Sequence, residues 1–305
     1  MRALSIGFDT SNYTTSCAVF DGECGGNSGR LLDVPEGALG LRQSDALFSH
    51  VKRLPEVFEK LDIDGRVVSV AASSRPREVE GSYMPCFLAG VCQAQVLATA
   101  LSVPYFEFSH QQGHIAAAAW SAGRYDLLET PHLAWHLSGG TTELLYVVPK
   151  GCSVVCEAVG GTGDVSAGQI IDRTGQMLDL RFPSGKALDD AAVSRGGGDF
   201  YQPRTDGLFF SLSGVEHKVK TMIEKGAAKD EAAYFVLMSI AKTVEAVTEK
   251  ALLSYGSIPV LFSGGVSSSR LLRGALNFGI FAEGAYSVDN ALGISILSHR
   301  AVNAL

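Results

Sequence analysis

The amino-acid sequence predicts an α/β protein with two lobes. Its 305 residues exceed the ~100–200 of a typical single domain, and its hydrophobic fraction of 46% is enough to fill two cores. Short apolar segments typical of strands alternate with longer segments typical of helices. One arrangement, a strand, a polar turn and a second strand, occurs twice, which suggests two related halves. We place the lobes at 1–130 and 131–305, and the last helix of the chain could pack back on the first lobe.

The first half is expected to run in the order strand, strand, helix, strand, helix. A strand at 3–8 leads into a turn rich in hydroxyls and then into a second apolar run at 16–20, the pattern of a β-hairpin. A glycine-rich surface stretch is expected next, at 22–29. It is followed by a helix at 49–61, a strand at 67–72 and a second helix at 85–104. The segment 85–104 is rich in alanine and holds two glutamines, which favours a buried helix over a membrane span.

The second half opens with the second hairpin, whose strands at 132–137 and 143–148 flank the turn 138–142. Two further helices are expected at 165–178 and 231–255. A strand is expected at 259–262, and the last two helices are expected to begin at 268 and at 290. We find no short-period repeat and no low-complexity segment beyond short glycine-rich loops.

The acidic balance of the chain argues against strong, unaided binding of nucleic acid. The net charge is −7, and neutralising phosphates requires clustered Lys and Arg. An RNA substrate would therefore need a local basic patch or a partner subunit. Lys218, Lys220 and Lys225, with His217 nearby, form one modest basic cluster, although a solvated helix face explains them equally simply.

The cysteines and the N-terminus indicate a protein of the cytoplasm. Six cysteines without a C-x-x-C pair do not make a disulfide framework in a chain of this length, so reduced thiols are expected. The N-terminal residues form a short apolar strand followed by a polar turn, unlike a signal peptide.

Three turns place Gly, Ser and Thr directly after buried strands. They are Asp9-Thr10-Ser11, Ser138-Gly139-Gly140-Thr141-Thr142 and Ser263-Gly264-Gly265-Val266. Glycine lets the backbone approach an anion closely, and a helix that begins just behind the third turn adds partial positive charge. We expect a phosphate-binding cleft, in which Asp9 holds a cation or a water; purely structural turns are the alternative.

His110 and His114 form the second candidate site. Ser109 and Gln112 have the spacing of a capping box, and the i, i+4 spacing then puts both imidazoles on one helix face, where they can share a metal ion. The glutamines at 111 and 112 remove the carboxylate base of a zinc protease. Further ligands could be His136 and Asp289. Each has a structural alternative. His110 and His114 could be partly exposed helix histidines, His136 a strand histidine that hydrogen-bonds to backbone, and Asp289 an N-cap of the following helix.

An ordered set of motifs resembles the TsaD/Gcp family, the threonylcarbamoyltransferases that modify adenosine 37 of tRNA and were once described as glycoproteases. The matching segments are I-G-F-D-T-S, H-Q-Q-G-H, L-S-G-G-T-T, I-I-D-R, F-P-S-G, F-S-L-S-G, G-G-V-S-S-S-R-L and Y-S-V-D-N, at 6–11, 110–114, 137–142, 170–173, 182–185, 210–214, 264–271 and 286–290. They span nearly the whole chain, and the resemblance implies the actin-like (ASKHA) two-lobed fold.

The resemblance also implies a site. The metal ligands of the family fall on His110, His114 and Asp289, with iron the metal of the family and zinc or manganese also compatible with these donors. Its ligand-binding positions fall on 136–140 (His136, Leu137, Ser138, Gly139 and Gly140), Asp172, Gly185 and Ser269. These positions imply an ATP or adenylate ligand, with Mg²⁺ as a further candidate ion, and a tRNA substrate that is met in a complex with TsaB-like and TsaE-like partner subunits.

The sequence departs from the family pattern at four places. Asp9 stands where the family usually has Glu, and Asn12-Tyr13-Thr14 replace Cys-Asp-Glu. Ser269 replaces an Asn of the ligand-binding turn, and His136 stands where some relatives have a Tyr metal ligand. The segment 73–76 replaces a Gly-Pro-Gly turn. The expected function is threonylcarbamoyl transfer to tRNA; the alternatives are a carbamoyl-type transferase with another acceptor, a nucleotide-binding scaffold subunit and, least consistent with the motifs, a protease.

Overall fold

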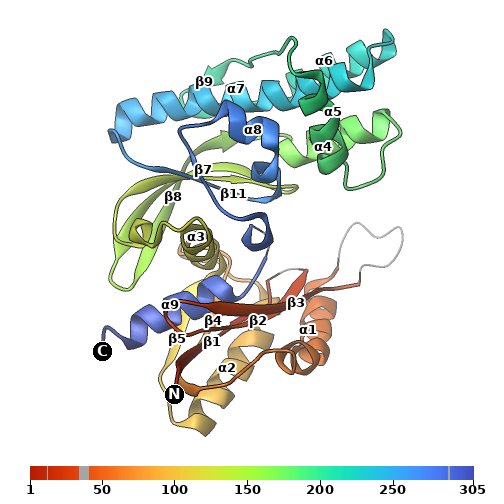
Figure 1. Ribbon diagram of the computed structural model, residues 1–305. Coiled ribbons are helices and arrows are strands. Elements are labelled where there is room, and N and C mark those ends of the chain that lie inside the picture. The colour runs from red at the N-terminus through yellow and green to blue at the C-terminus, as the bar shows by residue number, and fades with distance from the viewer. Residues whose placement is uncertain (12, 34–40, 288) are drawn as a thin grey trace. The chain divides into compact units, whose positions relative to one another are not determined.

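The structure is a computed structural model, and it describes residues 1–11, 13–33, 41–287 and 289–305. The chain packs as two compact units (Figure 1). The first unit comprises Met1–Thr130, Val148–Cys156 and Val288–Leu305, and the second comprises Pro131–Val147 and Glu157–Ser287. This division differs from a single boundary at residue 130, because 148–156 and 288–305 belong to the first unit.

The first unit is built on a five-stranded sheet with the order β3-β2-β1-β4-β5. Its strands are β1 (Ala3–Asp9), β2 (Thr14–Phe20), β3 (Gly25–Leu31), β4 (Arg66–Arg75) and β5 (Tyr105–Ser109). The predicted hairpin is confirmed, since β1 pairs antiparallel with β2, while β4 lies parallel on its other side. The glycine-rich stretch expected at the surface at 22–29 is mostly exposed, and most of it forms a strand that the sequence did not indicate, since Gly25–Leu31 pairs along the whole of β2 as an edge strand.

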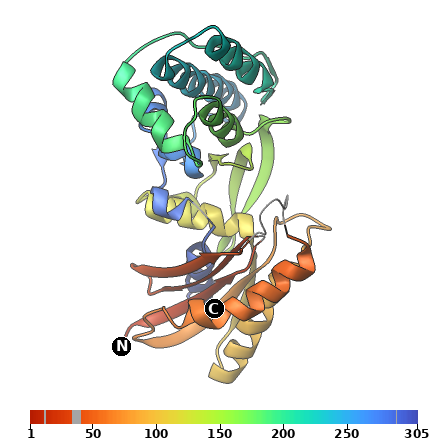
Figure 2. The ribbon, with the colours of Figure 1, turned by 90° about the vertical axis from the view of Figure 1, so that its right-hand side faces the viewer.

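Helices cover both faces of this sheet (Figures 1 and 2). They are α1 (Gln43–Phe58), η1 (Pro85–Phe87), α2 (Leu88–Leu101), α3 (His110–Ser121), η2 (Tyr125–Leu128) and α9 (Leu292–Val302). Because successive strand residues point to opposite faces, Ile6 and Phe8 form a core with α1 and α2, whereas Gly7 lies against Ser295 of α9. Asp9 at the end of β1 therefore lies on the same face as Gly7, toward α9.

The apolar segment 85–104 forms η1 and α2, as predicted, but only one face of α2 is buried. Ala94 and Ala98 are buried, whereas Val96 is 67% exposed and Leu101 is 45% exposed. Among the described residues, no helix combines the length and the apolar character that crossing a membrane requires.

The second unit is built around a mixed sheet with the order β12-β11-β6-β7-β8-β10-β9. Its strands are β6 (His132–Leu137), β7 (Thr142–Lys150), β8 (Ser153–Thr162), β9 (Thr205–Asp206), β10 (Phe209–Phe210), β11 (Val260–Ser263) and β12 (Ile280–Phe281). β6 pairs antiparallel with β7 and parallel with β11, as β1 does with β2 and β4. The repeated hairpin plan that the sequence predicts is therefore present in both units.

The helices of the second unit are α4 (Ala167–Met177), α5 (Gly185–Arg195), α6 (Ser213–Glu224), α7 (Lys229–Tyr255), η3 (Gly265–Ser268), α8 (Arg270–Ala275) and η4 (Gly284–Tyr286). The core contains Trp135 of β6, whose Nε1 donates to Thr248 of α7 over 2.9 Å. The predictions of α4, α7 and β11 are confirmed, whereas α5 and α6 were missed. The helix expected from Ser268 begins instead as the 3-10 turn η3, and α8 follows it.

Candidate metal centre and nucleotide cavity

The first turn of α3 positions the two histidines. The capping box predicted from the sequence is confirmed: Ser109 accepts a hydrogen bond from the Gln112 amide over 3.3 Å, and the Gln112 side chain accepts from the Ser109 amide over 2.7 Å. The side-chain Nε2 of Gln112 also donates to the Val154 carbonyl over 2.7 Å. Gln112 is therefore a buried structural residue that fixes where α3 begins, and with it the directions of His110 and His114.

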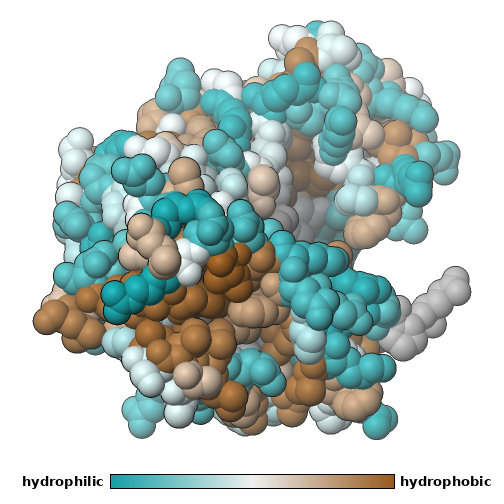
Figure 3. Space-filling model, turned by 60° about the horizontal axis from the view of Figure 1, so that its bottom comes forward, coloured by the Kyte–Doolittle hydropathy of each residue, from teal (hydrophilic) through white to brown (hydrophobic). Residues whose placement is uncertain are grey.

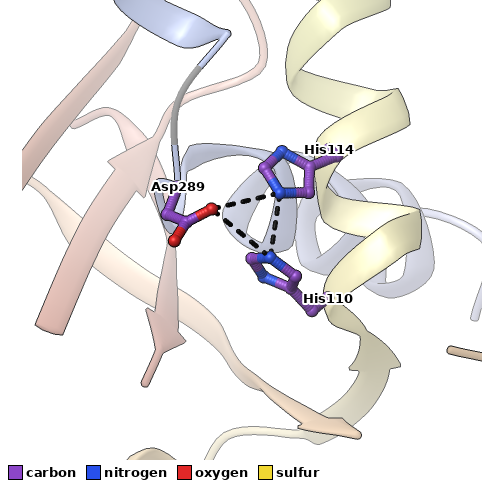
Figure 4. Close-up of side chains that lie close together, drawn as sticks. All are labelled: His110, His114 and Asp289. Carbon is purple, nitrogen blue, oxygen red and sulfur yellow. Dashed lines mark hydrogen bonds and ion pairs between the residues drawn. The ribbon is translucent and has the colours of Figure 1, made fainter. Parts of the chain in front are cut away.

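His110, His114 and Asp289 converge on one point (Figure 4). The two Nε2 atoms lie 2.8 Å apart, and Asp289 Oδ1 lies 3.6 Å from His110 Nε2 and 3.4 Å from His114 Nε2. Donors at ~2.0–2.1 Å around a tetrahedral ion are separated by about 3.3 Å, so the spacing of these atoms fits one shared divalent cation. Two imidazoles and a carboxylate suit iron, zinc or manganese.

Asp289 is held in place by a contact of its own side chain and by contacts of the residues that follow it. Its Oδ2 accepts a hydrogen bond from Thr14 over 3.3 Å, and the Ala291 amide donates to the Asn27 side chain over 3.0 Å. Beyond it, Gly293 of α9 lies against the carbonyl of Gly113 of α3, so close that a Cβ at 293 would stand 1.8 Å from that oxygen. We expect this glycine contact between α9 and α3 to determine how near Asp289 comes to the histidines.

The carboxylate of Asp9 lies behind His110. It is fully buried, and its Oδ2 lies 3.1 Å from His110 Nδ1 and accepts from Ser11 over 2.9 Å, while its Oδ1 accepts from Ser73. A carboxylate on the far ring nitrogen of a ligating histidine fixes the tautomer and the ring orientation. Asp9 is thus placed to orient His110, and the expectation that it holds a cation or water itself stays a prediction.

The carboxylates make this site attractive to positive charge. Burial disfavours the imidazolium of His110, but the charge of Asp9 and the hydrogen bonds to Asp289 and Asp9 outweigh it and raise the pKa of His110 to about 10. Burial also disfavours the ionised carboxylate of Asp289, yet the hydrogen bonds from both imidazoles hold its pKa well below the usual range. A divalent cation would satisfy the same demand for positive charge.

The hydroxyl of Thr10, in the turn Asp9-Thr10-Ser11, forms hydrogen bonds within the protein. It donates to the Cys86 carbonyl over 3.0 Å and accepts from the Gly90 amide over 3.1 Å. Thr10 and Ser11 are both buried. The structure therefore gives Thr10 a role in joining β1 to α2, and phosphate binding at this turn stays a prediction.

Five of the predicted ligand residues line one cavity of about 790 Å³ in the second unit: Gly139, Asp172, Gly185, Gly265 and Ser269. Three other predicted ligand residues, Leu137, Ser138 and Gly140, are not among those that line this cavity. Leu137 is buried in β6, Ser138 closes its own turn by accepting from the Thr141 amide over 3.1 Å, and Gly140 borders a smaller hollow of about 170 Å³. Gly264 has a φ of 88°, and a Cβ there would lie 2.2 Å from the Leu137 carbonyl, so only glycine fits.

His136 belongs to the second unit, where its Nδ1 lies 3.3 Å from Ser263 Oγ. The described residues that converge as a metal-binding group all belong to the first unit. A metal contact of His136 stays a prediction.

Similarity to known proteins covers most of the chain. A family model described as "TsaD: tRNA N6-adenosine threonylcarbamoyltransferase" matches residues 50–295. A tRNA N6-adenosine threonylcarbamoyltransferase of Enterococcus faecalis is 32% identical over 251 residues, which cover 74% of this chain and 69% of the relative. One of Limosilactobacillus reuteri is 28% identical over 299 residues, covering 90% and 82%.

The chain belongs to the tRNA N6-adenosine threonylcarbamoyltransferase family. Solved structures of lower identity share its fold. Full-length HypF in its phosphate- and nucleotide-bound form superimposes with a TM-score of 0.60 at 14% identity, over 99% of this chain and 55% of that one. A ROK family glucokinase of Streptomyces griseus does so with a TM-score of 0.53 at 13% identity, over 98% and 100%. The predicted actin-like, two-lobed α/β fold is confirmed.

One departure from the pattern of the threonylcarbamoyltransferase family has a structural explanation. Ser269 Oγ donates to Asp189 Oδ1 over 2.6 Å and accepts from the Leu272 amide over 3.2 Å, so it caps α8. Asp189 was missed from the sequence. Its place on α5, four residues after Gly185 and hence on the same helix face, is the signal that could have found it.

Replacing Asp9 by Asn is expected to weaken binding of the divalent cation by about 10- to 100-fold, because the amide loses the charge that holds His110 Nδ1–H. Titration of the purified protein with Zn²⁺ in competition with a chromogenic chelator measures the effect. Asp126→Asn, at an exposed ion pair of the same unit, is the matched control. Equal affinities of the Asp9→Asn variant and the wild type would contradict a positioning role.

Proposed function

We propose that this chain transfers a threonylcarbamoyl group from threonylcarbamoyl adenylate to adenosine 37 of tRNA, assisted by a divalent cation. The observation that carries the proposal is the convergence of His110, His114 and Asp289 in a chain whose relatives are named for this reaction. A scaffold subunit that only bound nucleotide would have no use for three convergent metal donors.

The residues of the first unit supply the metal centre. His110 and His114 would bind the cation through Nε2 and Asp289 through Oδ1, while Asp9 orients His110 and Thr14 holds Asp289. When bound, a divalent cation supplies Lewis acidity toward a carbonyl oxygen, here that of the threonylcarbamoyl group. The resemblance favours iron, with zinc and manganese as alternatives for the same donors.

The residues of the second unit supply the nucleotide site. We propose that the cavity beside Gly139 and Gly185 takes ATP or the adenylate, with Mg²⁺ accompanying the triphosphate. Asp172 Oδ1 accepts from the Ser184 amide over 2.8 Å, and this bond presents its carboxylate to a hydroxyl-bearing ligand. Glycines at 139 and 265 leave the backbone open, since a Cβ at either would meet no atom within 4 Å.

The proposal includes partner subunits, TsaB-like and TsaE-like, and a cytoplasmic setting. The net charge of −7 makes unaided binding of tRNA unfavourable. An apolar face of the first unit supports a protein partner: the exposed side chains of α1 and α2 there include Phe48, Val51, Leu88, Val96 and Leu101. Figure 3 shows apolar residues gathered on the face that carries these helices. A large exposed apolar patch is typical of a protein interface.

The test is reconstitution of the reaction. Threonylcarbamoyl adenylate, unmodified tRNA and the metal-loaded chain are incubated with and without candidate partner subunits, and nucleosides of the digested tRNA are identified by mass spectrometry. Modified adenosine at position 37 supports the proposal. Consumption of the adenylate with unmodified tRNA would point instead to another acceptor, and an unconsumed adenylate would overturn transferase activity.

A further inference from the structure

Five charged side chains line the cavity of the second unit: the carboxylates Asp172, Asp189 and Asp190 and the cations Lys186 and Arg270. A ligand that carries a phosphate needs a cation there, since the carboxylates alone would repel it. Which of the two cations is available depends on how each is already paired.

Arg270 is paired with the protein. Its Nε donates to Asp189 Oδ2 over 2.9 Å, its backbone amide donates to the same oxygen over 3.2 Å, and its Nη2 donates to Asp190. These contacts tie the start of α8 to α5. These bonds occupy Nε and Nη2, so Nη1 is the guanidinium nitrogen left for a ligand, and two carboxylates already offset the positive charge of Arg270.

Lys186 is available. It is the second residue of α5 and is exposed to solvent at the cavity wall. Within the part of the chain that the structure describes, its ammonium makes no hydrogen bond or ion pair. An ammonium on a flexible four-carbon stem can reach into the cavity, and lysine is a common phosphate ligand in proteins.

The surroundings of Lys186 also match a phosphorylated ribose. The Ser184 amide, two residues before Lys186, donates to one oxygen of Asp172, which leaves the other Asp172 oxygen to accept from a ligand hydroxyl. An acceptor for hydroxyls and a donor for an anion thus lie at the same end of the cavity. We propose that Lys186 binds a phosphate group attached to the ribose of the ligand, at its 5′ or at its 3′ position; this proposal rests on the proposed nucleotide site.

Calorimetric titration of the full chain with adenosine, 5′-AMP and 3′-AMP tests the assignment. The two monophosphates differ only in where the phosphate is attached. We expect Lys186→Gln to weaken binding of one of them about tenfold while adenosine binding changes less than about twofold, since a charge-assisted hydrogen bond is lost. Lys186→Arg should keep most of the affinity. The control is Lys225→Gln, at an exposed lysine of the same unit that lies outside the cavity wall.

The possible outcomes are distinct. A loss confined to 5′-AMP, or confined to 3′-AMP, supports the assignment and identifies the phosphate position. If Lys186→Gln weakens all three ligands equally or weakens none, the assignment to Lys186 is overturned while the nucleotide cavity stands. If the wild type binds none of the three, the nucleotide role of the cavity is overturned, and the assignment with it.

Discussion

Purified His110→Ala/His114→Ala protein is expected to contain no stoichiometric metal and to show no threonylcarbamoyl transfer above background. The pair supplies two of the three donors at the centre, and a lone carboxylate that is 37% exposed does not retain a divalent cation. The loss of affinity should exceed the ~10- to 100-fold typical for the loss of an outer-shell partner. Metal content by inductively coupled plasma mass spectrometry and the reconstituted transfer reaction measure the two effects.

The single variant His114→Ala separates loss of metal from damage to the fold. His110 also faces the buried carboxylate of Asp9, so removing His110 leaves that charge without its histidine partner. Removing His114 opens the centre while both members of the Asp9–His110 pair stay in the protein. His217→Ala, at an exposed histidine of α6, is the matched control. Full metal content and full transfer in the double variant would show that the reaction does not use this centre.

The parts of the site that follow from local spacing could be predicted from the sequence. The i, i+4 spacing of His110 and His114 and the capping box at Ser109 are determined within one helical turn, and the structure shows both. Asp289 could be offered only as one possible further ligand from the residues themselves, and the resemblance then placed it with the histidines. Nothing near it in the sequence indicates which residues 175 or more positions earlier it approaches. Its place depends on the packing of α9 against α3.

The parts that depend on side-chain direction at strand ends could not be predicted. Asp9 follows a buried strand, and nothing in that pattern indicates its contact with His110. The contact depends on the pairing of β1 with β4, which brings Ser73 to the same carboxylate. The hydrogen bond from Ser269 to Asp189 could not be predicted either, because it joins two helices whose residues lie 80 positions apart in the sequence.

The errors in secondary structure have related causes. Gly25–Leu31 has few apolar residues, yet it forms β3 because strand pairing uses backbone groups and β2 offers a free edge. In α5 and α6 the apolar positions are sparse and interrupted by charges, and their helical state is stabilised by packing against α7 and α4. Patterns in the sequence indicate such elements weakly because the stabilising partners are distant along the chain.

Gly293→Ala is expected to have the largest structural effect of any single methyl group added near the metal centre. The Cβ at 293 would lie 1.8 Å from the Gly113 carbonyl oxygen and 2.9 Å from Gly113 Cα, both backbone atoms of α3 that cannot rotate away. On the other side of α9, Gly7 of β1 lies close to Ser295, and a Cβ on residue 7 would lie 2.6 Å from the Ser295 amide nitrogen. The helix α9 is therefore confined between the sheet and α3. Overpacking of this kind costs typically ~1–3 kcal/mol and more where the backbone must move.

The same substitution should weaken metal binding beyond its cost in stability, because α9 can relieve the contact only by moving away from α3, and Asp289 precedes α9 by three residues. Denaturant unfolding and Zn²⁺ titration of Gly293→Ala are to be compared with Gly274→Ala, a glycine of α8 where an added Cβ meets no atom within 4 Å. The control should be as stable as the wild type or gain up to ~1 kcal/mol, since alanine favours helices. If Gly293→Ala folds and binds Zn²⁺ as the control does, the glycine contact does not set the distance between Asp289 and the histidines; a folded variant with selectively weakened Zn²⁺ binding would establish that it does.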